Sequence, residues 1–205
     1  MPSSSIHMSV YKTINKKLKR GEEFLIGNIA PDCWRHSLYH INKEKSHFIN
    51  NGLEDYKEFY KKYKKNLNND FTLGYLTHLM TDNYWKVFVV PNYKINNTTV
   101  RLKDNTLFTG TSEEIKELLH NNNQIATYHI AKHYDLKLLN ENPKIQCNVE
   151  EIDLSGLSNT LKHINKINFQ EPFKELDVYD INDIYNYISN CSDFILEELE
   201  KMKTY

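Results

Sequence analysis

The chain has 205 residues, 40% of them hydrophobic and 26% charged, which is an ordinary composition for a globular protein. The 26 basic and 27 acidic residues give a net charge of −1, so no global field draws the protein to nucleic acid or to an anionic membrane, and we expect no stable nucleic-acid complex. Because no linker is visible, we expect a single domain over residues 1–205, with its function at a local site.

The cysteines and the N-terminal sequence predict a cytoplasmic protein. Cys33, Cys147 and Cys191 are odd in number and far apart, which excludes a disulfide framework and a CxxC zinc or redox motif. Free thiols are typical of a reducing compartment. The first residues lack a basic segment followed by an apolar one, and no run of about 18 apolar residues could span a bilayer. We therefore expect no leader and no transmembrane segment.

The spacing of apolar residues predicts an all-α, compact, multi-helix fold. Only 6 glycines and 5 prolines interrupt the chain, and its apolar residues mostly recur at helical rather than alternating positions. The first helix is expected to follow the N-cap candidates Ser3–Ser5, to carry an apolar stripe from Ile6 to Leu18 and to end at Gly21.

A central helix is expected after two shorter segments. Residues 24–30 are apolar, and Pro31 disfavours helix in the residue before it, so Asp32 is expected at a turn or at a new helix start. Residues 53–63 resemble a surface helix with aromatic side chains on its inner side. Residues 71–90 are the most apolar stretch and predict the central helix.

The second half of the chain is predicted to contain two long helices. Residues 92–110 are polar with short alternations, which indicates a small hairpin or a long loop. Thr111 reads as the cap of a helix that reaches about Leu139. The chain is expected to be irregular from Pro143 to Asp180, before a last helix that includes Ile184–Leu199.

His78 and Asp82 are candidate metal ligands in the predicted central helix. They stand four residues apart, so their side chains leave one face with β-carbons about 5–6 Å apart and can hold one ion. Most such pairs are simply a buried histidine with an aspartate partner. A metal is favoured here because an unpaired carboxylate among apolar neighbours would be costly. Those neighbours are Leu73, Leu76, Leu79 and Met80.

Further nitrogen and oxygen donors lie in the first half of the chain: His7, Asp32, His36, His40 and His47. Together they are more than a hydrophobic core needs. Structural zinc sites prefer cysteine, whereas mixed histidine and carboxylate ligands with open positions are typical of catalytic sites. The donors therefore predict a catalytic metal centre.

Four segments occur in a characteristic order. They are Pro2 with His7, the sequence FLIGNIAPD that ends at Asp32, the tripeptide SHF around His47, and the sequence LGYLTHLMTDNYW over residues 73–85. This order resembles the bacterial zinc-dependent phospholipase C family, which is similar in fold to P1-type nucleases. Beyond Pro91 we recognise nothing comparable.

The resemblance implies a compact all-α domain that hydrolyses phosphate esters with a cluster of up to three zinc ions. It implies that His47, His78 and Asp82 bind one metal and that Asp82 bridges toward a second, which His7 also binds. Asp32 corresponds to an aspartate that either completes the shell of the first metal or orients the attacking water as general base.

Two features differ from the family pattern. In secreted members the processed N-terminus binds zinc, whereas here Met1 and Pro2 precede His7. The ligands of a third metal are also unmatched, because no glutamate follows His129 or His133 at the required spacing. We expect one or two zinc ions, with other divalent transition metals as alternatives.

Other conspicuous residues have plainer interpretations. His129 and His133 fit a metal-binding pair or, more often, a simple helix face. His36 and His40 are more often surface residues, although their position also suits contact with a substrate. The run Lys61–Lys65 is more often a solvated helix face than a nucleic-acid site.

The sequence thus predicts a metal-dependent hydrolase of phosphate esters or diesters, acting through metal-activated water on a phosphate-ester substrate such as a phospholipid or a nucleotide. The alternative is a non-catalytic helical protein that keeps its metal for stability and partner binding. The chain lacks the adjacent His-Asp of HD-type phosphohydrolases, the HExxH of zincin proteases and the GxxxxGK[ST] of P-loop proteins.

Overall fold

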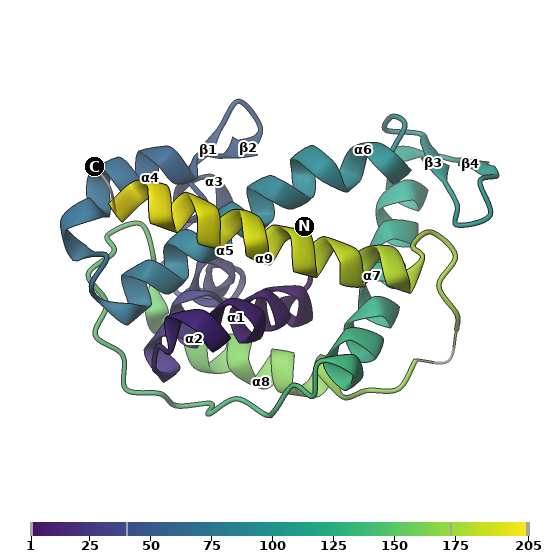
Figure 1. Cartoon of the computed structure of the whole chain (residues 1–205). Coiled ribbons are helices and arrows are strands. Elements are labelled where there is room, and N and C mark those ends of the chain that lie inside the picture. The colour runs from purple at the N-terminus through teal and green to yellow at the C-terminus, as the bar shows by residue number, and fades with distance from the viewer. Residues whose placement is uncertain (1, 40, 173, 204–205) are drawn as a thin grey trace.

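The computed structural model describes residues 2–39, 41–172 and 174–203. The fold is mainly helical, which confirms the all-α prediction (Figure 1). In chain order the helices are α1 (Ser4–Leu18), α2 (Glu22–Gly27), the 3₁₀-helix η1 (Ala30–His36), α3 (Lys43–Ser46), α4 (Tyr56–Tyr63), the 3₁₀-helix η2 (Lys64–Asn66), α5 (Asp70–Phe88), α6 (Val90–Tyr93), α7 (Ser112–His133), the 3₁₀-helix η3 (Leu154–Gly156), α8 (Leu157–Asn168) and α9 (Ile181–Lys203).

Among the described residues, four short strands form two antiparallel hairpins. Strand β1 (Ile49–Asn50) pairs with β2 (Leu53–Glu54), and β3 (Thr99–Arg101) pairs with β4 (Leu107–Thr109). The second hairpin is one of the two alternatives predicted for residues 92–110.

Helix α5 is the core helix of the fold. Every residue from Phe71 to Asp82 is buried, and the helix contacts α1, α2, α4 and α9. The helix begins at Asp70, next to the predicted start at residue 71. The Asn69 side chain accepts a hydrogen bond from the Thr72 N–H and so caps the first turn. A helix that is covered on all sides can hold polar side chains only where those side chains find partners.

Two glycines bring α2 against α5. A β-carbon at Gly74 would overlap the carbonyl oxygen of Phe24, and one at Gly27 would overlap the backbone of Phe71. Only a residue without a side chain permits such a close approach. As a result, Asn28, which directly follows α2, lies beside α5. Its side-chain amide donates to Thr77 Oγ1 at 2.6 Å.

The predicted end of the first helix is wrong. Helix α1 ends at Leu18 because Lys19 adopts a left-handed conformation, with φ of 52°, and its N–H bonds to the Asn15 carbonyl. Gly21, the predicted end, instead precedes α2, and its N–H donates to Asp70 Oδ2 at 2.8 Å.

The predicted surface helix over residues 53–63 begins later than expected. Leu53 and Glu54 belong to strand β2, and α4 begins at Tyr56. The reason is local, because the Asp55 side chain accepts a hydrogen bond from the Glu58 N–H and so caps the helix.

The second half of the chain contains a helix that the sequence analysis missed. Helix α8 lies in the segment predicted to be irregular, and it buries Leu157, Leu161 and Ile164 at helical spacing. Helix α7 begins as predicted after a capping box at Thr111, but it ends at His133, short of the predicted end near Leu139.

This second half packs against the elements that carry the predicted ligands. The Tyr187 hydroxyl of α9 donates to the Thr81 carbonyl of α5 at 2.8 Å. Gly156 of η3 lies so close to the backbone of Cys33 and His36 that a side chain there would overlap it. The buried residues of both halves form one hydrophobic cluster.

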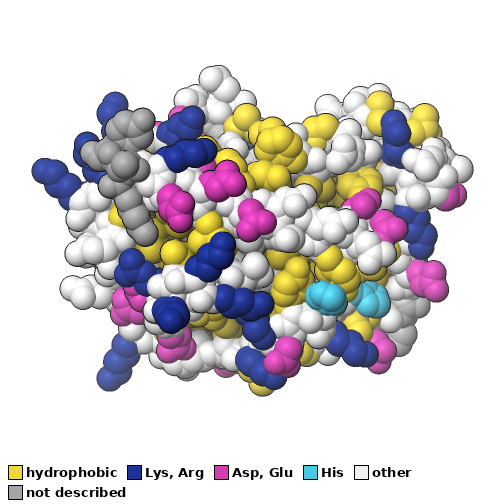
Figure 2. Space-filling view, viewed as in Figure 1, with side chains coloured by type: hydrophobic (Ala, Val, Ile, Leu, Met, Phe, Trp, Pro, Cys, Tyr) yellow, Lys and Arg dark blue, Asp and Glu magenta, His cyan; other side chains and the backbone are white. Residues whose placement is uncertain are grey.

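The surface carries mixed charge. Basic and acidic side chains are interspersed on the face in Figure 2, in keeping with the net charge of −1. In the run Lys61–Lys65 the lysines are exposed and Tyr63 is buried. No helix among the described residues is long and apolar enough to cross a membrane.

Candidate metal centre

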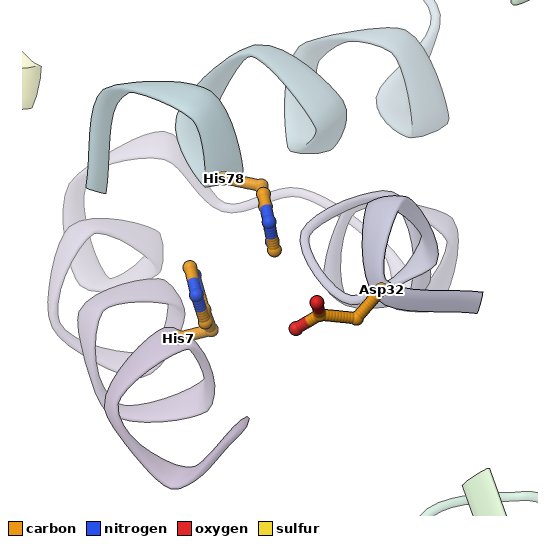
Figure 3. A group of neighbouring side chains, drawn as sticks. All are labelled: His7, Asp32 and His78. Carbon is orange, nitrogen blue, oxygen red and sulfur yellow. The ribbon is translucent and has the colours of Figure 1, made fainter. Parts of the chain in front are cut away.

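Five side chains from four parts of the chain meet beside α5: His7 of α1, Asp32 of η1, His47 directly after α3, and His78 and Asp82 of α5. They form two overlapping groups whose ligand atoms lie within 4.8 Å of one another, His47 with His78 and Asp82, and His7 with Asp32 and His78. The second group points inward from three helices in Figure 3. These are the five residues that the sequence analysis proposed as ligands.

The distances in the first group suit a tetrahedral zinc ion. The Nε2 atoms of His47 and His78 are 3.3 Å apart, and Asp82 Oδ2 lies 3.7 Å from each of them. Two ligand atoms bound to zinc at about 2.0–2.1 Å and at the tetrahedral angle are about 3.3–3.4 Å apart. The three atoms therefore have nearly the spacing of a zinc shell.

The histidine tautomers direct lone pairs into the centre. His78 Nδ1 is 2.8 Å from the Asn28 carbonyl oxygen, which only accepts hydrogen bonds, so Nδ1 carries the proton and Nε2 is bare. His47 Nδ1 is 2.8 Å from the hydroxyl of Ser46, whose own proton can go to the Lys43 carbonyl at 3.4 Å. When Nδ1 of His47 also carries its proton, two bare Nε2 atoms face each other at 3.3 Å, and they repel unless a cation or a proton lies between them.

Asp82 presents one oxygen to each group. Its Oδ2 faces His47 and His78, and its Oδ1 is 3.2 Å from His7 Nε2. The side chain is only 1% exposed, and among the described residues neither oxygen has a hydrogen-bond partner. A buried carboxylate needs compensating charge, and the two directions are those of a carboxylate that bridges two cations.

Asp32 has the most exposed side chain of the five. Its Oδ1 is 3.6 Å from His47 Nε2 and 3.9 Å from Arg35 Nε. The Asp32 side chain is 19% exposed, whereas those of the other four residues are at most 2% exposed. Asp32 is therefore the member of the centre nearest to solvent.

The electrostatics favour the protonation states that bind metal. Burial raises the pKa of Asp82, but the neighbouring His78 and His7 outweigh this and hold it well below its usual range. For Asp32, the interactions with His47 and His78 likewise outweigh burial and lower the pKa. Burial, followed by the charge of His7, lowers the pKa of His78 to about 3. Ionised carboxylates and neutral imidazoles are the ligand forms.

Some supporting contacts could not be assigned from the sequence. The hydroxyls of Thr77 and Thr81, which lie next to His78 and Asp82 in the sequence, donate to backbone carbonyls of α5 itself, and Asn83 donates to strand β2. Ser46 holds the ring of His47. The sequence feature that could have indicated this role is the position of Ser46 directly before His47.

The remaining histidines lie elsewhere. His129 and His133 are exposed, and the His133 ring stacks on Tyr185 with centroids 3.9 Å apart. His36 is exposed beside His163, with ring centroids 6.1 Å apart, and His40 is outside the described residues. Among the described residues, none of these joins a potential metal-binding group.

No curated protein and no solved structure matches the chain. A family model does match, over residues 6–105, and the family is described as zinc dependent phospholipase C. The matched segment contains all five residues of the centre. The match confirms the resemblance to the zinc-dependent phospholipase C family over residues 6–105, which are 100 of the 205 residues.

Proposed function

We propose that this protein is a zinc-dependent hydrolase of phosphate esters or diesters. One ion would be held by His47, His78 and Asp82, and a second by His7 and the other oxygen of Asp82. The observation that supports this most directly is the pair of buried Nε2 atoms 3.3 Å apart, with an unpartnered carboxylate 3.7 Å from both.

Asp82 and Asp32 would have different roles in the hydrolysis. When bound, zinc supplies a Lewis acid and lowers the pKa of bound water toward about 7. Asp82 would fix the distance between two ions because it offers one oxygen to each. Asp32 would either complete the shell of the first ion or accept the proton of the attacking water, since it is the most exposed of the five.

The proposed substrate is a phosphate ester, supplied either as a phospholipid or as a soluble compound such as a nucleotide. Fold and metal set do not fix the leaving group. We also propose that residues 1–205 act as a single domain, because the buried residues of both halves form one cluster. A cytoplasmic location is part of the proposal and is supported by three free cysteines.

The test is to measure metal content and hydrolysis on the same preparation. Protein purified without chelators should hold one or two zinc ions per chain and should hydrolyse bis(p-nitrophenyl) phosphate, a nucleotide phosphodiester or a phospholipid. His78→Ala should abolish hydrolysis and lower zinc content while the helical circular dichroism signal persists. His133→Ala, which changes an exposed histidine far from the centre, is the matched control.

One observation favours the alternative of a non-catalytic metal protein. Four of the five side chains are at most 2% exposed, a degree of closure that structural metal sites share. Under this alternative, wild-type protein would be fully metallated and yet inert toward phosphomonoesters, diesters, nucleic acids and phospholipids. That result would exclude the hydrolase.

A further inference from the structure

The segment that carries His47 reaches the metal centre from outside α5. His78 and Asp82 stand four residues apart on α5, so the helix itself fixes the distance between them. His47, in contrast, follows the short helix α3 and precedes the β1–β2 hairpin. Its place beside the other two ligands therefore depends on the contacts that hold this segment against α5.

Two side chains of α5 hold the β1–β2 hairpin. The Asn83 side-chain amide donates to the Glu54 carbonyl at 2.9 Å, and Lys86 Nζ donates to the Gly52 carbonyl at 2.9 Å. Lys86 Nζ also lies 2.6 Å from Glu54 Oε1. Asn83 and Lys86 belong to the turn of α5 directly after Asp82, so the hairpin is fastened next to the metal centre.

The ion pair between Lys86 and Glu54 is not an ordinary surface pair. The Glu54 side chain has no exposed area, and the Lys86 side chain is 22% exposed. Among the described residues, no second ion pair involves Glu54. A buried carboxylate that loses its counter-ion must take up a proton or move toward water. Because Glu54 pairs with Ile49 across the hairpin, such a movement would carry β1 along with β2.

The backbone directly after His47 adopts a conformation that needs support. Phe48 has φ of 50°, in the left-handed region that a bulky side chain rarely adopts. The Phe48 ring packs on Phe59 with centroids 5.2 Å apart, and the Phe48 carbonyl accepts the Asp55 N–H at 2.9 Å. A strained conformation of this kind persists only where the surrounding structure enforces it. Here the hairpin is part of that structure, because Asp55 directly follows β2.

We infer that the ion pair between Lys86 and Glu54 positions His47 for metal binding. It fastens the hairpin to the helix that carries two other ligands, and it thereby maintains the turn at Phe48. Lys86 and Glu54 are positioning residues, since both act through the backbone of the His47 segment. The inference rests on the proposed function only through the metal centre, because it requires an ion bound at His47.

The test uses Co²⁺ in place of zinc, because the visible absorption of Co²⁺ reports the number and the arrangement of its ligands. Lys86→Met should change the visible spectrum of the cobalt-loaded protein. It should also weaken zinc binding about 10-fold, measured by competition with a fluorescent zinc chelator. Lys86→Arg keeps the charge and should restore the wild-type spectrum and most of the zinc affinity.

A second variant keeps the test decisive if Lys86→Met does not fold. The double variant Glu54→Gln with Lys86→Met removes the unpaired buried charge and still lacks the ammonium that holds the hairpin. It should show the same change in the cobalt spectrum and the same loss of zinc affinity.

The matched control is an ion pair at the opposite end of the same helix. Arg20 Nη1 lies 3.0 Å from Oδ1 of Asp70, the first residue of α5. Arg20→Met should lower the denaturation midpoint but leave the cobalt spectrum and the zinc affinity unchanged. If Lys86→Met also lowered only the midpoint, its role would be purely structural and the inference would be overturned.

The outcomes separate this inference from the proposed function. A Lys86→Met protein with the wild-type spectrum and zinc affinity would overturn the role of the ion pair and leave the hydrolase intact. A wild-type protein that binds zinc but hydrolyses no phosphate ester would exclude the hydrolase, and the cobalt comparison would still decide the role of Lys86. A wild-type protein that binds neither metal would overturn both.

Discussion

The imidazole of His7 stacks on that of His78, with ring centroids 4.0 Å apart and planes 6° from parallel. The contact joins α1 to α5. It brings together two candidate ligands that are far apart in the sequence, one in the first helix and one in the core helix. Two stacked imidazolium rings would repel, so at least one ring must be neutral. His78 is the neutral one because burial lowers its pKa to about 3.

The metal-free protein should lose stability on mild acidification. His78 binds a proton near pH 6.5 in the unfolded chain but only near pH 3 in the native state. Between these values the unfolded state binds more protons, so the free energy of unfolding rises with pH. The contribution is complete above pH 6.5 and is lost as the pH falls toward 3. Below about pH 4, Asp82 and Asp32 act in the same direction, because their native pKa values are also lowered.

Urea unfolding of chelator-treated protein between about pH 7.5 and pH 5 would measure this effect. The midpoint should fall with pH in the wild type and in His133→Asn, and should fall less steeply in His78→Asn. A midpoint that stays constant or rises on acidification would contradict the assignment of a neutral His78.

Removal of metal should lower thermal stability reversibly. A ligand that binds only the folded state at about 1,000 times its Kd adds about 4 kcal/mol, which for a chain of this size raises Tm by on the order of 10 °C. Differential scanning calorimetry with chelator and then with added zinc measures the shift. Asp82→Asn should show little response to zinc, and an equal response in that variant would exclude Asp82 as a ligand.

Ser46 should matter for zinc affinity although it does not touch the metal position. Its hydroxyl lies 2.8 Å from His47 Nδ1 and holds the ring in its orientation, and loss of such a partner typically weakens metal binding about 10- to 100-fold. Competition with a fluorescent zinc chelator would compare Ser46→Ala with Ser192→Ala. Ser192 is also buried, but its hydroxyl donates to Ile188 on a different helix. Equal affinities for the two variants would refute the role of Ser46.

Gly74→Ala should destabilise the fold through α2. The added methyl group would overlap the Phe24 carbonyl, so the helices must separate, at a cost of about 1–3 kcal/mol or more. Gly21→Ala is the control, because its β-carbon would meet Asp70 Oδ2 at an ordinary 3.4 Å. Chemical denaturation compares the two, and similar stabilities would mean that α2 moves freely relative to α5.

Separating α2 from α5 should also affect the metal centre. The Asn28 carbonyl, which holds His78 Nδ1 at 2.8 Å, directly follows α2. Gly74→Ala should therefore lower zinc affinity as well as stability, and Gly21→Ala should leave zinc affinity unchanged.

The parts of the centre that depend on local geometry could be predicted from the sequence. His78 and Asp82 share a face because four residues complete about one helical turn, and the apolar run around them made the core helix evident. The proximity of Asp32 and His47 could not be derived in that way. It depends on how η1 and α3 pack on α5, and only the family resemblance indicated it.

In the second half of the chain, the spacing of apolar residues alone did not suffice to predict a helix. Leu157 and Leu161 carry the spacing of a buried helix face, but polar residues between them and the absence of a clear cap concealed α8. Helix α7, by contrast, begins with a capping box at Thr111 and was predicted from its first turn. A strong local signal at a helix start thus identifies a helix better than its apolar stripe alone.

The hydrogen bond from Tyr187 to the Thr81 carbonyl joins the second half of the chain to the core helix. The residues that would do chemistry come from the half that matches the family, but α9 and the turn at Gly156 brace them from outside that half. A chain shortened to residue 105 would keep all five proposed ligands but lose the helix and the turn that support them. The core helix beside Asp82 therefore depends on the second half of the chain for its support.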